Sequence, residues 1–578
     1  MVAPRTRTDL CAGSRWSRLA GIVIALSLSA SSAAPIVQAA QGPGSLIESA
    51  VVVDSPFSPD RDGIRDKVYV DVRLVSAASM TVTVRDFADR PIRVIATAVD
   101  RDAGTWRWSW NGRDGQRRIV PDGPYRFSVT ATDGSGASGS MVVAVAKAPR
   151  APYPPAPGAI TVVLNPGHGG RDPGAVYGGI KEEDMVLDTA LRLREMLEAS
   201  GIRVVMTRST DRAVNDPPVD AIGDGDVSLR DELAARNDVA NLARADLYVT
   251  LMDNAYGCRC VRGSETWTND ERTWSPEAVA FASLVQSAHS RRLEPFRSSS
   301  WYPIDRGVRF YDFYVVRPYR QRDVPRPSLM PSVMTESLFM DHSNELAVLA
   351  KWKARGQLAV AFFEAITDWL ARRAYGLRYE VIDAPDVRPT ASTGDYRVEV
   401  TNTGNATSAG WVVEARVVPA VPLYDGSPAP GTLLASVPFP DGIAPGAQAV
   451  LHLDGVPLPA EAGDWLVKLD VRLPSGKTLG WHGVVGPQLP LTTVGPETPP
   501  PSPEITPEPA PGVTRDAEMP PDAASPHDVG PEVVLDDLWI RPAPGWSAEA
   551  WRGLLRRIVR AGPYGPDEPL GHHHDGDG

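Results

Sequence analysis

The chain has 578 residues, 43% of them hydrophobic, and its formal net charge is −12. This length is sufficient for three or four domains, and 55 prolines and 50 glycines favour short β-rich modules and linkers over one large helical fold. Binding to nucleic acid depends on Lys and Arg side chains that neutralise phosphates. The acidic balance therefore argues against a nucleic-acid partner.

Residues 1–39 have the pattern of a secretory signal peptide. Arginines precede an apolar run, LAGIVIALSLSA, and Val37-Gln38-Ala39 offers a cleavage site of small residues. The run is short for a bilayer span and is interrupted by serines, so we expect cleavage and no stable membrane span in the mature chain. The mature protein is expected to be secreted or held in the cell envelope.

Residues 45–148 alternate apolar and polar side chains in short runs such as VYVDVRLV and MTVTVRDF, which predicts an antiparallel β-sandwich. The segments SPFSPDRDGIRD and WNGRDGQRRIVPDGPYRFSVTATD resemble Ig-like modules of the flagellar hook-capping type. The resemblance implies a spacer or docking module. Residues 149–158 are rich in proline and are expected to form a stiff linker.

Strand-like and helix-like segments alternate through residues 159–375. The runs ITVVL, IRVVMTR, ADLYVTL and PSVMTE predict strands. This alternation predicts an α/β domain with a mostly parallel sheet and helices on both faces, in which ligands bind beyond the carboxyl ends of the strands. The expected helices cover residues 183–200, a segment that begins after Ser228 with Asp231 completing a capping box, residues 276–291 and residues 344–373.

Side chains suited to metal chemistry stand at the ends of these segments. His168 lies in the glycine-rich turn NPGHGGRD after the first strand, Glu182 lies where the first helix begins, and Glu336 interrupts the apolar run PSVMTESLF. An unpaired carboxylate at the end of a buried strand is costly, so a functional role is favoured for Glu336. One imidazole and two carboxylates predict a hydrolytic metal site.

Several motifs occur in one order: NPGHGGRDPGA, KEEDMVLDTALRLREMLEASGIRVVMTRSTD, LAARNDVANLARADLYVTL, DRGV and MTESLFM. This pattern resembles the zinc-dependent N-acetylmuramoyl-L-alanine amidases, which cut peptidoglycan between the lactyl group of muramic acid and the first alanine of the stem peptide. The resemblance implies an exported peptidoglycan hydrolase that uses Zn²⁺ to activate water. It assigns His168 and Glu182 as metal ligands and Glu336 as the catalytic carboxylate, with Glu183 the candidate ligand if the register slips by one.

One position departs from the family pattern. The family's strand ends in Ser-Ile-His-Ala-Asn, whereas this chain has Thr250-Leu251-Met252-Asp253-Asn254, so Met252 stands where a zinc-binding histidine is expected. A neutral thioether suits zinc poorly. Met252 itself and Asp253 are possible third ligands, while His342 and His289 are more distant candidates. Two functions therefore remain open: a metal-dependent amidase, or a degenerate amidase fold that acts as a secreted cell-wall-binding or adhesion protein.

Cys258 and Cys260 are separated by a single residue. They are expected to form a local disulfide or to remain as two thiols, in a compartment where disulfides persist. A third possibility is that one thiolate completes the metal site.

The remainder of the chain returns to β patterns and then loses periodicity. Residues 378–486 predict a second Ig-like β-sandwich, similar to adhesion or CARDB-type modules, whose tryptophans favour a core role over a glycan surface. Residues 487–535 are rich in proline and are expected to be a disordered linker. Residues 536–578 are expected to form a tail with one short amphipathic helix.

Overall fold

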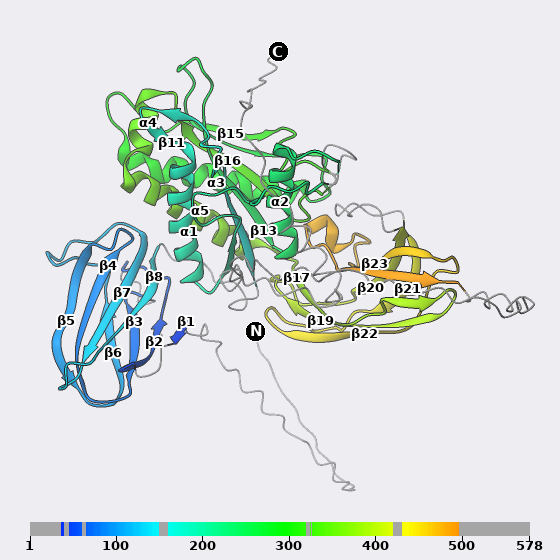
Figure 1. Cartoon of the computed structure of the whole chain (residues 1–578), viewed down its shortest axis with the longest axis horizontal. Coiled ribbons are helices and arrows are strands. Elements are labelled where there is room, and N and C mark those ends of the chain that lie inside the picture. Colours follow the sequence, from blue (N-terminus) through cyan, green and yellow to red (C-terminus); the bar gives the residue numbers. More distant parts are fainter. Residues whose placement is uncertain are drawn as a thin grey trace, which may run out of the picture.

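The computed structural model describes residues 45–60, 65–148, 160–222, 224–318, 324, 326–419 and 431–495, together with the backbone of residues 36–39. It consists of an N-terminal β module, a central α/β domain and a C-terminal β module (Figure 1). The predicted linker at residues 149–158 and the predicted helical tail at residues 536–578 lie outside the described residues, as do positions 1–35 of the predicted signal peptide.

The N-terminal module contains two antiparallel sheets around one core. Val70 and Val52 from one sheet and Val82 and Phe127 from the other belong to the same buried cluster. The predicted cleavage site falls within the first strand, which pairs with the second through Val37 and Val51. The strands, in sheet order, are β1 (Ile36–Ala39), β2 (Ile47–Val53), β3 (Val68–Leu74) and β6 (Gly104–Trp110), and then β5 (Pro91–Arg101), β4 (Ala78–Asp86), β7 (Gly123–Thr132) and β8 (Ser138–Lys147).

The central domain is built on a six-stranded sheet. All of its neighbouring strands run parallel except β14 and β16, which are antiparallel, so the predicted, mostly parallel sheet is confirmed. The order is β12 (Arg203–Met206), β9 (Thr161–Pro166), β13 (Leu247–Asn254), β16 (Ser332–Phe339), β14 (Ser264–Thr268) and β15 (Asp305–Phe310). A short hairpin, β10 (Val176–Tyr177) and β11 (Ile180–Lys181), precedes the first helix.

Helices cover both faces of this sheet because its strands are apolar on both sides. Val162 on β9 packs with α1 (Glu182–Glu198), α3 (Ser275–Leu293) and α5 (Trp352–Arg372) in one cluster. Val163, the next residue, packs on the opposite face with Ala240 of α2 (Leu229–Leu242). The capping box at the start of α2 forms as predicted, with Ser228 as the N-cap.

The predicted single helix at residues 344–373 is wrong, because the chain breaks it into α4 (Ser343–Leu349) and α5. Lys351 has extended backbone dihedrals and becomes the N-cap of α5. None of the helices in the described residues is both long and apolar enough to cross a bilayer.

The C-terminal module also contains two sheets around one core, which includes Trp411. Its last strand, β24 (Gln488–Val494), corrects the predicted start of the disordered linker at residue 487, because Leu489 and Leu491 are buried and the strand pairs with β23. The other strands are β17 (Leu377–Asp383), β19 (Thr393–Asn402) and β22 (Gln448–Pro457) in one sheet, and β18 (Val387–Pro389), β23 (Gly463–Arg472), β20 (Val412–Pro419) and β21 (Thr432–Pro438) beside β24 in the other.

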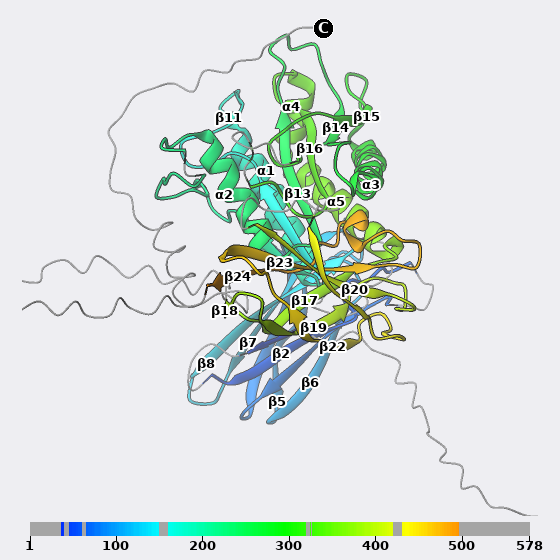
Figure 2. The same ribbon diagram turned by 90° about the vertical axis from the view of Figure 1, so that its right-hand side faces the viewer.

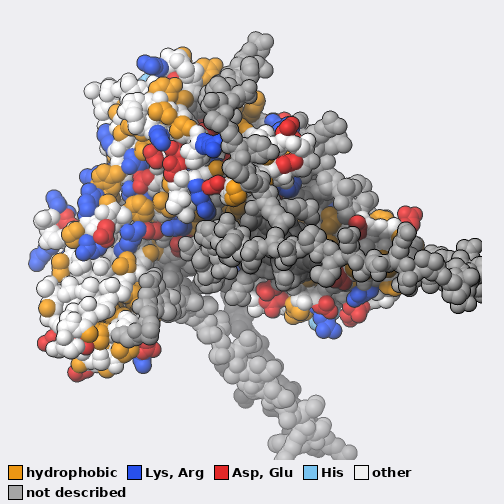
Figure 3. Space-filling model, viewed as in Figure 1, with side chains coloured by type: hydrophobic (Ala, Val, Ile, Leu, Met, Phe, Trp, Pro, Cys, Tyr) orange, Lys and Arg blue, Asp and Glu red, His pale blue; other side chains and the backbone are white. Residues whose placement is uncertain are grey.

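A charged junction joins the N-terminal module to the helices of the central domain. Asp122 pairs with Lys147 in its own module and with Arg292 of α3 at 3.0 Å, and Arg292 also pairs with Glu364 of α5. Figure 3 shows Lys, Arg, Asp and Glu side chains gathered where the two parts meet. The N-terminal module therefore contacts α3 directly through an ion pair, and Arg292 extends this contact to α5.

The C-terminal module caps α5. The Asn405 amide donates hydrogen bonds to the carbonyl oxygens of Leu370, Ala371 and Arg373 at 3.0, 3.1 and 2.9 Å, which satisfies carbonyls that a helix end leaves without partners. Replacement of Asn405 with alanine is expected to destabilise the chain by about 1–3 kcal/mol. Urea unfolding would measure this, with the exposed Thr407→Ala from the same loop as a comparison; an effect no larger than that of Thr407→Ala would contradict the capping role.

Candidate functional site

His168 lies in a tight turn directly after β9, with a backbone φ of 57°. Two arginines from elsewhere in the domain bind the carbonyl oxygens of this turn. Arg208 Nη2 donates to Gly167 at 2.6 Å, and Arg236 Nη2 donates to His168 at 2.7 Å. Arg236 also binds the carbonyl of Pro166 at 2.9 Å. These contacts hold the turn in the left-handed backbone conformation that presents the imidazole.

Both nitrogens of the His168 ring contact carboxylates. Nδ1 lies 2.8 Å from Asp172 Oδ2, and Nε2 lies 3.1 Å from Glu182 Oε1. Burial by itself would lower the pKa of His168, but the hydrogen bonds to Asp172 and Glu182 outweigh it and raise the pKa to about 10. Asp172 was not predicted from the sequence, although its place four residues after His168, in the same glycine-rich turn, was an available signal.

Glu182 is the first residue of α1, and its side chain is buried. Its Oε1 accepts a hydrogen bond from the Asp253 backbone nitrogen at 3.0 Å, and its Oε2 accepts one from the Ala175 nitrogen at 3.0 Å. Glu183 instead pairs with Lys181 at 2.8 Å. The structure therefore places Glu182, rather than its neighbour, against His168.

Glu336 reaches the same region from β16. Its strand register places it beside Met252 of β13 and opposite Glu265 of β14. Burial raises the pKa of Glu336 well above its usual range, and the nearby carboxylates of Glu182 and Asp253 raise it further. One of its oxygens, Oε2, is buried without a hydrogen-bond partner in the structure. The three site residues predicted from three chain segments thus interact in one place.

Met252 adds no nitrogen or oxygen ligand for a metal ion. A Cβ atom on Gly167 would overlap its sulfur, so the thioether lies directly against the turn that carries His168. The rest of the side chain packs beside Val163, Tyr248 and Met334. The sequence places a thioether, rather than an imidazole, in the space next to the histidine turn.

The backbone nitrogen of Asp253 donates a hydrogen bond to Glu182. The Asp253 side chain is buried, and this burial, followed by repulsion from Glu182, raises the pKa of its carboxyl group well above the usual range. Across the described part of the chain, no three His, Cys, Asp or Glu side chains are grouped so that they could hold a metal ion. His342, at the N-cap of α4, and His289, inside α3, do not complete such a group either. The residues present therefore do not fit a three-ligand zinc site.

His289, named above as a more distant ligand candidate, is a buried core residue. Its ring packs edge-to-face on Phe362 at 4.7 Å, and burial lowers its pKa to about 4. The unfolded chain therefore binds a proton that the folded chain excludes between about pH 6.5 and pH 4, so stability that is full above pH 6.5 is lost as the pH falls toward 4.

We expect this group to remove on the order of 3 kcal/mol of folding free energy between pH 7 and pH 4. His289→Leu should show a shallower loss of stability over that range in urea unfolding. Exposed His452→Leu serves as the control and should keep the wild-type slope. Equal slopes in wild type and His289→Leu would show that the buried ring does not control the acid response.

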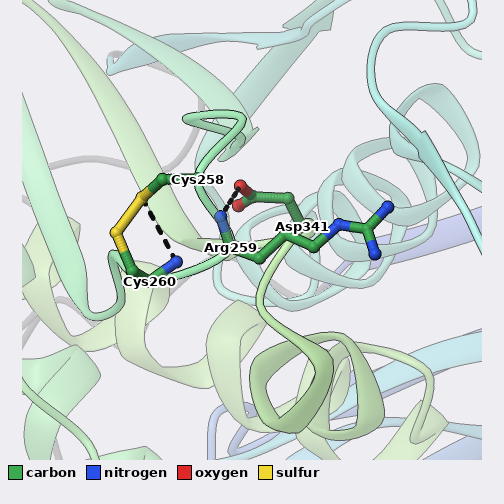
Figure 4. Close-up of a disulfide and its surroundings, with 4 residues drawn as sticks. All are labelled: Cys258, Arg259, Cys260 and Asp341. Carbon is green, nitrogen blue, oxygen red and sulfur yellow. Dashed lines mark hydrogen bonds between the residues drawn. A yellow bond between two sulfur atoms is a disulfide. The ribbon is translucent and has the colours of Figure 1, made fainter.

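The Cys258 and Cys260 sulfurs form a disulfide in the loop between β13 and β14, with Cα atoms 5.2 Å apart (Figure 4). The nitrogen of Arg259 donates to Asp341 Oδ2 at 3.1 Å and ties this loop to the segment after β16. Because both sulfurs are oxidised, neither is available as a thiolate ligand. This corrects the third possibility considered for these cysteines.

Comparisons with known proteins agree with this architecture. Residues 162–368 match the N-acetylmuramoyl-L-alanine amidase family, and residues 62–135 match the FlgD Ig-like domain. The chain therefore carries a domain of the N-acetylmuramoyl-L-alanine amidase family, preceded by a FlgD-type Ig-like domain.

Each of the following relatives matches a little over a third of this chain. N-acetylmuramoyl-L-alanine amidase LytC of Bacillus subtilis is 27% identical over 213 residues, which cover 36% of this chain and 35% of LytC. The endolysin of Bacillus phage SPP1 is 30% identical over 36% of this chain and 65% of its own length. Among solved structures, N-acetylmuramoyl-L-alanine amidase AmiC2 of Nostoc punctiforme is 27% identical, with a TM-score of 0.29, over 37% of this chain and 99% of that chain. The chain thus spans about a third of LytC and less than two thirds of the endolysin.

Proposed function

We propose that this chain is exported to the cell envelope and binds peptidoglycan through its amidase domain, without the three-ligand zinc reaction. Its homologues are peptidoglycan amidases, which supports a muramoyl peptide as the ligand class. The observation that carries the proposal is the position of Met252, whose sulfur lies against Gly167. In the pattern of the amidase family, this sequence position is expected to hold a zinc-binding histidine. The chain's own residues would then hold the peptide at the carboxyl ends of β9, β13 and β16.

Hydrolysis of the bond between muramic acid and alanine is a second candidate, and one observation favours it. Glu336 keeps a buried carboxyl oxygen that has no hydrogen-bond partner in the structure. A buried polar atom of this kind is costly, and perturbed groups of this kind gather at functional sites. A carboxyl group in this position is suited to exchange a proton with a bound amide.

Two measurements on the full chain separate these functions. In the first, the protein is dialysed against a chelator and then against buffer that contains zinc, and the zinc content per chain is measured. In the second, the protein is mixed with purified peptidoglycan, and co-sedimentation and the release of stem peptides are followed. The binding proposal expects co-sedimentation, much less than one zinc per chain and no released peptide. One tightly bound zinc ion per chain together with released stem peptides would establish hydrolysis. Failure of the protein to sediment with peptidoglycan would reject the binding proposal.

A further inference from the structure

A second group of side chains lies on the same face of the sheet as Glu336, on β14 and β15, the two strands that follow β16 toward the edge of the sheet. β16, β14 and β15 lie side by side in that order (Figure 2). In the register between β14 and β16, Glu265 is opposite Glu336 and Trp267 is opposite Met334, while Trp267 is beside Arg309 of β15. Side chains at paired positions share one face of a sheet, so this row continues directly from the candidate site.

The outer part of the row is an aromatic cluster formed by Trp267, Tyr311 and Phe313. Trp267 lies 6.2 Å from Tyr311 and 5.3 Å from Phe313 between ring centroids, and Tyr311 lies 4.8 Å from Phe313. The Tyr311 backbone nitrogen binds the Thr268 carbonyl at 3.1 Å, which fixes the turn after β15. Tyr311 is nevertheless 60% exposed. A rigid aromatic surface of this kind is typical of a binding surface.

The part of the row between this cluster and Glu336 carries positive charge. The buried Glu265 carboxylate pairs with Arg306 at 2.6 Å and with Arg309 at 3.0 Å, so two guanidinium groups face one carboxylate. The Arg309 side chain is 41% exposed, and its guanidinium lies 5.8 Å from the centre of the Trp267 ring. A guanidinium has five N–H donors, so Arg309 can bind an incoming carboxylate while it keeps its contact with Glu265.

We propose that this row is the subsite that selects the muramoyl peptide, an inference that rests on the proposed peptidoglycan binding. The apolar face of a sugar ring would stack on Tyr311 beside Trp267, and an acidic group of the stem peptide would pair with Arg309. The charge pattern supports this occupant. Although the chain as a whole is acidic, Arg306 and Arg309 carry two positive charges against the single negative charge of Glu265, beside an aromatic surface. An acidic ligand is complementary to this arrangement. The site thereby recognises both components of the wall polymer, the sugar and the acidic peptide.

The test uses the full chain and two soluble probes, N-acetylmuramoyl-L-alanyl-D-isoglutamine with its free carboxylate and the same molecule with that carboxylate converted to an amide. Wild type should bind the acid at least about fivefold more tightly than the amide. Tyr311→Ala should weaken both probes by about tenfold, because it removes the stacking surface. Arg309→Gln should weaken the acid alone and make the two affinities equal, because it removes the charge-assisted contact.

Trp481→Ala is the matched control, since Trp481 is an aromatic residue of the C-terminal module that is 38% exposed, and it should leave both affinities unchanged. Thermal unfolding of each variant checks that the fold is retained. If wild type sediments with peptidoglycan but does not bind the acid probe, or if both variants bind as wild type does, the subsite is rejected while the proposed function stands. If wild type binds neither polymer nor probe, the proposed function itself fails.

Discussion

Replacement of Met252 with histidine is expected to give this chain one tightly bound zinc ion. The site already holds an imidazole and a carboxylate 3.1 Å apart, and the Met252 side chain occupies the space beside the turn that carries that imidazole. An imidazole at residue 252 would supply the third nitrogen or oxygen donor that zinc requires. Since even changes outside the ligand shell alter metal affinity by about 10- to 100-fold, gain of a whole ligand should raise zinc affinity by about 100-fold or more.

Zinc competition with a chromophoric chelator would measure this gain in the full-length protein. Met252→Leu is the matched control, because it keeps an apolar side chain of similar volume without adding a ligand, and its zinc affinity should stay at the wild-type level. Release of stem peptides by Met252→His would show that Glu336 is still placed for hydrolysis. If Met252→His binds zinc no better than Met252→Leu, the assignment of His168 and Glu182 as a preserved half-site is incorrect.

Replacement of Arg208 with methionine is expected to destabilise the central domain by about 3–5 kcal/mol. Arg208 is 1% exposed and donates to the carbonyls of Pro166, Gly167, Glu183 and Thr210, so its loss would leave several buried acceptors without partners. Burial, followed by repulsion from Arg236, lowers the pKa of Arg208 to about 10. The His168 turn should lose its order at the same time.

Chemical unfolding would give the stability change, and the exposed Arg212→Met provides a control from the same segment that should change stability by less than about 0.5 kcal/mol. Binding to peptidoglycan should fall with Arg208→Met at temperatures where the domain is still folded. Stability equal to that of Arg212→Met would mean that the carbonyl contacts contribute little and that other residues hold the turn.

Sequence periodicity was sufficient to predict the α/β domain and to place His168 and Glu336 at one edge of its sheet, because residues at the carboxyl ends of neighbouring parallel strands meet there. Glu182, the first residue of α1, was indicated only by the family resemblance. Strand β14 and the edge strand β15 were not predicted. They are short and carry charged residues such as Glu265 and Arg306, and they are recognised as strands only from the pairing of β14 with β16 and of β15 with β14.

The partners of the site residues could not be predicted for a related reason. Arg236 reaches the His168 turn from α2, and the nitrogen of Asp253 reaches Glu182 across a bulge in the pairing of β13 with β16. Such contacts are set by tertiary packing and leave no local pattern. The break between α4 and α5 is of the same kind, since Lys351 is a residue that favours helices and no proline or glycine marks the break.

Helix α5 touches all three modules of the chain. Gln357, near its first turns, donates to the Asp122 carbonyl of the N-terminal module at 3.2 Å, and Asn405 of the C-terminal module binds its last carbonyls. The two outer modules are therefore attached near opposite ends of one helix, so unfolding of α5 would remove contacts of both modules with the central domain at the same time.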